Sequence, residues 1–126
     1  MSTKTILIAD DSATMRAMLV SIVESLGDYQ IVEASSGFEV LRLLPRGPVD
    51  LILTDINMPD INGLELISYL RKNLNYKDIP VFIISTEGSA KDIEKGKQLG
   101  ADEYVVKPFS PASLQLLINK YLYKTA

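Results

Sequence analysis

The stretch LILTDINMPDING, residues 51–63, decides the fold, because it joins an apolar strand directly to a charged turn. Residues 51–54 have the composition of a strand that is covered on both faces of a parallel sheet. Asp55 follows at once, and the turn after it contains Pro59 and Gly63. A carboxylate at the rim of an apolar core is costly unless something pairs with it. The rest of the sequence must therefore supply a partner for Asp55 or a reason for its position.

Four other apolar runs have the same character, and amphipathic patterns separate them. The predicted strands are residues 6–9, 31–34, 51–54, 81–84 and 104–106. The predicted helices follow apolar stripes within residues 15–26, 40–44, 64–74, 90–99 and 114–122. Pro45 is expected to stop the second helix. The fourth helix has the thinnest apolar stripe and contains Gly96, which weakens a helix by roughly 1 kcal/mol against alanine.

This alternation predicts an α/β fold, because each crossover between parallel strands must be right-handed and carries its helix onto a face of the sheet. We expect a single domain over residues 1–126 with the architecture (βα)5, a doubly wound parallel five-stranded sheet. The flavodoxin-like strand order 2-1-3-4-5 is adopted as the common arrangement for this pattern. Ligands of such sheets bind beyond the carboxyl ends of the strands.

The composition excludes several classes of function. The net charge is −3 and no basic run occurs, which disfavours nucleic-acid binding. The sequence has neither cysteine nor histidine, so a metal would be held by oxygen atoms, as magnesium, calcium and manganese are. The first apolar run is too short for a signal peptide or a membrane span. We therefore expect a cytoplasmic protein that does not bind a membrane.

Three acidic residues follow the two strands that the adopted order makes neighbours, namely Asp10 and Asp11 after the first and Asp55 after the third. Two carboxylates about 5 Å apart repel by roughly 3 kcal/mol at an effective dielectric of 20, and a hard divalent cation would reverse that cost. Asp10 and Asp11 could instead cap the first helix, for which Ser12 is also a candidate. The presence of Asp55 favours a magnesium site over simple capping.

Two further strands end in polar residues that would face the same edge. The fourth strand runs into Ser85 and the fifth into Lys107. Ser85 could simply cap the next helix, and a single lysine is usually a surface residue. Because both converge on three acids, they are better interpreted as ligands of a phosphate or an oxyanion.

The motifs ILIADDS, LILTDINMPDINGLEL, VFIIST and YVVKPF resemble, in this order, the four motifs of the receiver domain of two-component response regulators. The resemblance runs from Lys4 to about Tyr123, and within the family it is strongest to the stand-alone chemotaxis response regulator. It implies a signalling switch rather than an enzyme. Asp55 would accept a phosphoryl group from a histidine kinase in a Mg²⁺-dependent reaction, and the domain would support its own dephosphorylation.

The resemblance also implies a role for individual residues. Asp10, Asp11 and Asp55 would bind Mg²⁺ together with the backbone carbonyl of Asn57. The hydroxyl of Ser85 would move onto the phosphoryl group. Lys107 would pair with that group and precede Pro108 through a cis bond, and Tyr104 would swing inward on activation.

Two more expectations concern how long the signal lasts and where it is read. Asn57 and Glu87 each lie two residues past a site residue, so both should tune the lifetime of the phosphoryl group, with Glu87 solvated and able to orient a water molecule. The poorly packed helix 90–99 should move, and a downstream target protein should bind the surface of residues 86–123.

Two alternatives use related chemistry or the same topology. A magnesium-dependent phosphohydrolase of the haloacid-dehalogenase type would also use an aspartyl nucleophile, but it needs a second acid where this chain has Asn57. A flavin-binding module of flavodoxin type would need a glycine- and hydroxyl-rich phosphate loop after the first strand. Asp10 and Asp11 would repel that phosphate.

Overall fold

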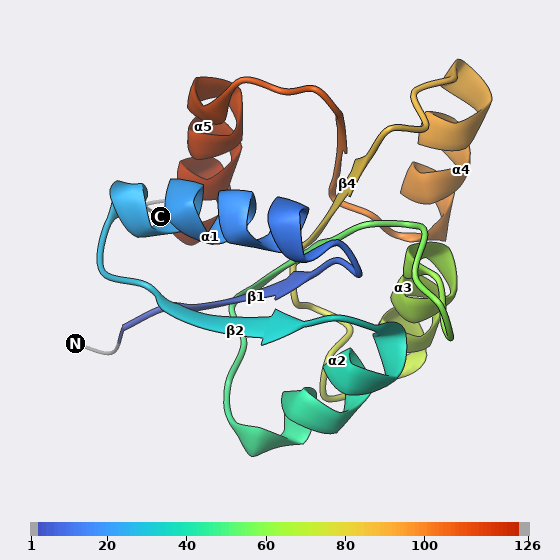
Figure 1. Cartoon of the computed structure of the whole chain (residues 1–126). Coiled ribbons are helices and arrows are strands. Elements are labelled where there is room, and N and C mark those ends of the chain that lie inside the picture. Colours follow the sequence, from blue (N-terminus) through green and yellow to red (C-terminus); the bar gives the residue numbers. More distant parts are fainter. Residues whose placement is uncertain (1–2, 124–126) are drawn as a thin grey trace.

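The computed structural model describes residues 3–123, so the outermost residues of the predicted single domain lie outside the described part. Strands and helices alternate along the chain (Figure 1). Their bounds are β1 Thr5–Ala9, α1 Ala13–Leu26, β2 Gln30–Ala34, α2 Gly37–Leu43, η1 Leu44–Arg46, β3 Leu51–Thr54, α3 Gly63–Lys72, β4 Val81–Ser85, α4 Ala90–Leu99, β5 Glu103–Val106 and α5 Pro111–Leu122. The predicted α/β class is confirmed.

The strands form one parallel sheet in the order β2-β1-β3-β4-β5, as expected. Helices cover both faces, α1 and α5 on one side and α2, α3 and α4 on the other (Figure 1). Alternate strand residues therefore enter two separate cores. Leu7 and Ile52 contribute to the core under α2 and α3, whereas Ile8 and Leu53 contribute to the core under α1 and α5. Because every strand runs in the same direction, all carboxyl ends reach the same edge.

Each α-helix begins at a polar residue whose side chain accepts a hydrogen bond from a backbone N–H three residues on. These N-cap residues are Ser12, Ser36, Asn62, Ser89 and Ser110. Ser12 therefore caps α1, which leaves the carboxylates beside it available for another use. Ser89 caps α4, so the alternative that Ser85 is a helix cap is wrong.

The second helix stops before Pro45, as expected, because α2 ends at Leu43 and Pro45 lies in the separate 3₁₀ turn η1, where its missing N–H is not needed. One helix boundary differs from the expectation. Leu74 was expected on the apolar stripe of the third helix, but α3 ends at Lys72 and Leu74 is 84% exposed. Within residues 3–123, no helix combines the length and the apolar character that crossing a bilayer requires.

Candidate functional site at the carboxyl edge of the sheet

Three carboxylates meet where β1 and β3 end. The register pairs Ala9 with Thr54, so Asp10 and Asp55 leave neighbouring strands side by side. One carboxylate oxygen each of Asp10, Asp11 and Asp55 lies within 4.8 Å of the others. The structure therefore brings together the three acids that the sequence singled out.

The surrounding backbone fixes Asp10 firmly. Its side chain is almost completely buried, and its Oδ1 accepts a hydrogen bond from the N–H of Ser12 at 2.9 Å. Arg16 donates from Nη1 to the backbone carbonyl of Asp10 at 2.7 Å, and the N–H of Asp10 donates to Ala34 on β2. Asp11, by contrast, is exposed. One acid of the cluster is thus rigid and another can adapt to a ligand.

Lys107 supplies the cation that faces this cluster. Its Nζ lies 3.3 Å from Oδ2 of Asp10 and 3.4 Å from Oδ2 of Asp55. The Lys107 side chain is only 11% exposed, and its backbone N–H donates to the carbonyl of Ser85 on β4. The peptide bond to Pro108 is cis, as the resemblance implied. A single ammonium group therefore serves two largely buried carboxylates.

The carboxyl group of Asp55 is poorly stabilised as an anion. Burial raises its pKa above the ordinary value of 3.8, Lys107 opposes this rise, and the negative charge of Asp10 adds to it. Its Oδ1 accepts a hydrogen bond from the N–H of Ile56 at 2.7 Å. A carboxylate with few donors and a like charge beside it gains from any added cation.

The loop after β4 places Ser85, Glu87 and Tyr104 in one hydrogen-bonded group. Ser85 is fully buried, and its Oγ accepts a hydrogen bond from the N–H of Glu87 at 3.1 Å. The hydroxyl of Tyr104 donates to the backbone carbonyl of Glu87. Tyr104 is partly buried and lies against α4. The ring is therefore packed inward in this structure.

Glu87 keeps part of its surface exposed, and its Oε1 accepts a hydrogen bond from Nδ2 of Asn57 at 3.3 Å. Its expected role in orienting a water molecule stays a prediction. The two residues expected to tune the lifetime thus contact each other across the loops after β3 and β4. The expectation that the backbone carbonyl of Asn57 binds a metal stays a prediction.

Two residues that flank the loop after β3, Thr54 at the end of β3 and Gly63 at the start of α3, were not predicted to shape the site so directly. Thr54 is buried and donates from Oγ1 to the backbone carbonyl of Asp55 at 2.9 Å. A Cβ on Gly63 would collide with that same carbonyl and lie 3.1 Å from Cα of Ile56. The sequence marked Gly63 only as a turn residue, and its close approach to Asp55 depends on the tertiary path of the loop.

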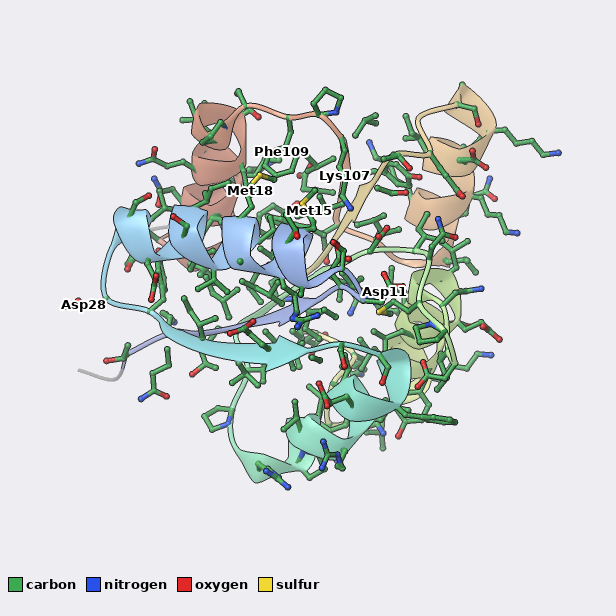
Figure 2. The ribbon with its side chains drawn as sticks, in the orientation of Figure 1. Asp11, Met15, Met18, Asp28, Lys107 and Phe109 are labelled. Carbon is green, nitrogen blue, oxygen red and sulfur yellow. The ribbon has the colours of Figure 1, made fainter. Side chains whose placement is uncertain are left out.

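The donor set suits a hard divalent cation. It consists of carboxylate oxygens from three residues, which Mg²⁺ prefers and softer metals do not. Figure 2 shows Asp11 and Lys107 toward one end of helix α1, with Asp28 at its other end. Met15 and Phe109, which pack against the core under α1 and α5, lie near Lys107 in the same view.

Comparisons with known proteins agree with this geometry. The response regulator receiver domain family matches residues 6–119. A chemotaxis protein CheY homolog of Campylobacter jejuni is 37% identical over 111 residues, which cover 87% of this chain and 85% of that protein. CheY-3 of Vibrio cholerae is 36% identical over 115 residues, covering 91% and 88% of the two chains.

Solved structures show the same arrangement. The chemotaxis response regulator CheY4 of Vibrio cholerae superposes with a TM-score of 0.87 at 31% identity, covering 96% of this chain and all of that one. A putative response regulator from Chloroflexus aurantiacus gives a TM-score of 0.91 at 28% identity, covering 98% and 100%. The family match and these relatives each extend over most of the chain, and so does the shared architecture. The chain belongs to the response regulator receiver domain family and is of the CheY type.

Proposed function

We propose that Asp55 accepts a phosphoryl group from a histidine kinase and that the chain acts as a Mg²⁺-dependent switch, not as an enzyme with a substrate of its own. The observation that carries this proposal is the placement of the Lys107 ammonium against both Asp10 and Asp55. An Asp55 side chain that is 12% exposed remains reachable yet is poorly solvated. Such a carboxylate suits nucleophilic attack on phosphorus.

In the proposed step an oxygen of Asp55 attacks the phosphorus atom of a phosphohistidine. A P–O bond forms, the P–N bond breaks, and its electron pair stays on the imidazole, which leaves. The donor histidine must belong to the partner, because this chain contains none. Phosphoryl transfer depends mainly on positioning and charge neutralisation, and Lys107 would supply one positive charge to the phosphoryl oxygens.

Mg²⁺ fits the same site and would supply further neutralisation of the phosphoryl oxygens when bound. Asp10, Asp11 and Asp55 would hold it, with the backbone carbonyl of Asn57 as a fourth protein ligand. In its absence, the cluster retains the mutual repulsion of its carboxylates, which Lys107 only partly offsets. The three acids would therefore bind Mg²⁺ but lower the stability of the metal-free fold.

The switch would act through the loop after β4. The hydroxyl of Ser85 would donate to a phosphoryl oxygen, and the hydroxyl of Tyr104 already contacts the same loop through the carbonyl of Glu87. A rearrangement there would change the surface formed by α4, β5 and α5, within residues 86–123. A downstream target protein that prefers the changed surface would read the signal.

The proposal predicts labelling at a single residue. Acetyl phosphate or a phosphorylated histidine kinase, with Mg²⁺, should label the chain through a bond that is stable in acid and labile in base. Asp55→Asn should lose the label completely, whereas the control Asp60→Asn, an acid of the same loop, should retain it. Lys107→Ala should fold, yet its labelled form should fail to shift hydrogen exchange in residues 86–106. Labelling that survives in Asp55→Asn would overturn the assignment.

A further inference from the structure

The face of helix α4 that packs on the sheet contains a glycine, Gly96, and the ring of Tyr104 lies against it. Gly96 is buried and faces the sheet. A Cβ at Gly96 would lie 2.9 Å from Cδ1 of Ile83 and 3.0 and 3.2 Å from two ring carbons of Tyr104. Real Cβ atoms essentially never approach a heavy atom closer than 3.0 Å. A larger residue at position 96 would therefore force the end of the Ile83 side chain to move and would press on the ring of Tyr104, which would have to give by a few tenths of an ångström.

The backbone gives no other reason for this glycine. Gly96 is not among the residues with positive φ, unlike Gly100 at the end of the same helix, so an L-residue could adopt its conformation. Alanine at a helix interior is also the better helix former. Helix α4 is thinly packed, as expected, and the missing side chain at position 96 leaves room for the ring of Tyr104 to lie against the helix.

The position of the ring matters because of where its hydroxyl reaches. The hydroxyl of Tyr104 donates to the carbonyl of Glu87, and the N–H of Glu87 donates to Oγ of Ser85. One residue thus connects the ring of Tyr104 to the buried hydroxyl beside the acid cluster. Burial raises the pKa of Tyr104 above its ordinary value of 10.0, so the group remains a donor near neutral pH.

We propose that Gly96 is a positioning residue, whose lack of a side chain allows Tyr104 to occupy the inward position in which it bonds to the loop after Ser85. A methyl group at position 96 would press the ring outward by a few tenths of an ångström and weaken this hydrogen bond. The residue at 96 would then set how strongly the acid site and the surface of α4 and β5 are coupled. This role in regulation rests on the proposed function, whereas the packing of the ring does not.

The packing is tested first, on unphosphorylated protein without Mg²⁺. Nuclear Overhauser contacts between the ring of Tyr104 and the δ1 methyl group of Ile83 should be strong in the wild type. They should fall by more than half in Gly96→Ala. Gly47→Ala is the matched control, because a Cβ there meets nothing within 4 Å, and it should leave these contacts unchanged. Unchanged ring contacts in Gly96→Ala would overturn the proposal.

A second variant separates the contributions of Ile83 and Tyr104, because the added methyl group would contact both side chains. Combining Gly96→Ala with Ile83→Val removes the closest aliphatic neighbour and leaves only the ring in the way. Contacts from the ring to the loop at Glu87 should still be weaker than in the wild type in this double variant. If they equal those of the wild type, Ile83 and not Tyr104 is the residue that position 96 controls, and the proposal fails.

Coupling to the acid site is tested with beryllofluoride and Mg²⁺ as the probe. A less populated inward ring should weaken binding at least about threefold in Gly96→Ala, with no change in Gly47→Ala. In a Tyr104→Ala background the same substitution should have no further effect, since the ring it displaces is absent. A weakening that persists in that background would overturn the proposal. Failure of the wild type to bind the probe would instead refute the proposed function, and the ring contacts would still decide the role of Gly96.

Discussion

At the edge where the strands end, Asp10 and Asp55 lie close together and share one lysine, whereas at the edge where they begin, Asp50 and Asp102 lie apart and each accepts the first N–H of another strand. Asp50 accepts the N–H of Thr5 at the start of β1, at 2.8 Å. Asp102 accepts the N–H of Val81 at the start of β4, also at 2.8 Å. The first edge gathers acids at one place, and the second uses acids to join the starts of neighbouring strands.

Arg71 donates to several hydrogen-bond acceptors at the edge where the strands begin. Its guanidinium group donates to Asp102 at 2.8 Å and also to the backbone carbonyls of Gly100, Lys77 and Ile79. One side chain of α3 thus fastens the end of α4, the approach to β4 and the turn before β5. The comparison predicts that mutations at this edge reduce stability, while mutations at the other edge change ligand responses.

The largest expected effect on stability is at Arg71. Arg71→Ala should lower the free energy of unfolding by about 2–3 kcal/mol, because it leaves a carboxylate and several carbonyls without their charged donor. Arg71→Lys should recover less than half of the loss, since one ammonium cannot reach all four acceptors. Urea denaturation measures both variants. A loss below about 1 kcal/mol for Arg71→Ala would show that this edge is not the stabilising one.

A substitution at Asp11 is expected to change the free energy of unfolding in the opposite direction, toward greater stability. Without Mg²⁺, Asp11→Ala should raise the free energy of unfolding by about 1 kcal/mol, because it removes one repelling charge from the cluster. Mg²⁺ should raise the melting temperature of the wild type and have almost no effect on this variant. Asp28→Ala, at the far end of α1, is the control and should keep the full response to Mg²⁺ (Figure 2). Equal gains from Mg²⁺ in wild type and Asp11→Ala would mean that the metal binds elsewhere.

The same contrast explains which parts of the molecule could be predicted from the sequence. Strand runs and helix stripes are local patterns, so the fold class followed from them, and the neighbouring ends of β1 and β3 placed Asp10 and Asp55 together. The role of Arg71 was not predictable, because its acceptors are backbone carbonyls distant in sequence. The sequence marked Gly96 only as a residue that weakens its helix, and the close approach of the Tyr104 ring depends on the tertiary packing of α4 on the sheet.

The lifetime of the phosphoryl group proposed on Asp55 should depend on the contact between Glu87 and Asn57. Glu87→Ala removes the acceptor at 3.3 Å and any orientation of water by this carboxylate, so the phosphoryl group should persist about threefold to tenfold longer. Glu87→Gln keeps a hydrogen-bonding oxygen without the charge and separates the two contributions. The decay of base-labile label over time measures the rate. An unchanged decay in both variants would assign Glu87 a purely structural role.

The smallest expected effect on stability is at Asp60. It tests whether the role of an acid depends on the edge of the sheet where it lies or on the N–H groups that donate to its carboxylate. Asp60 lies in the loop after β3, yet its carboxylate accepts the N–H groups of Gly37, Phe38 and Ile61. Although desolvation opposes the effect, these donors lower its pKa below the ordinary value of 3.8. Asp60 therefore resembles the acids of the opposite edge, and it ties the start of α2 to the loop that follows Asp55.

The sign of the pH dependence follows from the direction of this shift. A carboxyl group with a lowered pKa in the folded state stabilises the protein above its unfolded pKa, and this contribution disappears as the pH falls through the folded pKa. The small deficit of Asp60→Asn against the wild type should thus be constant above about pH 5 and vanish toward about pH 2. Asp60→Ala also removes the acceptor oxygens, so part of its deficit should remain in acid. Urea denaturation across this range measures all three proteins, and a deficit of Asp60→Asn that grows in acid would show that the charge of Asp60 does not hold α2 in place.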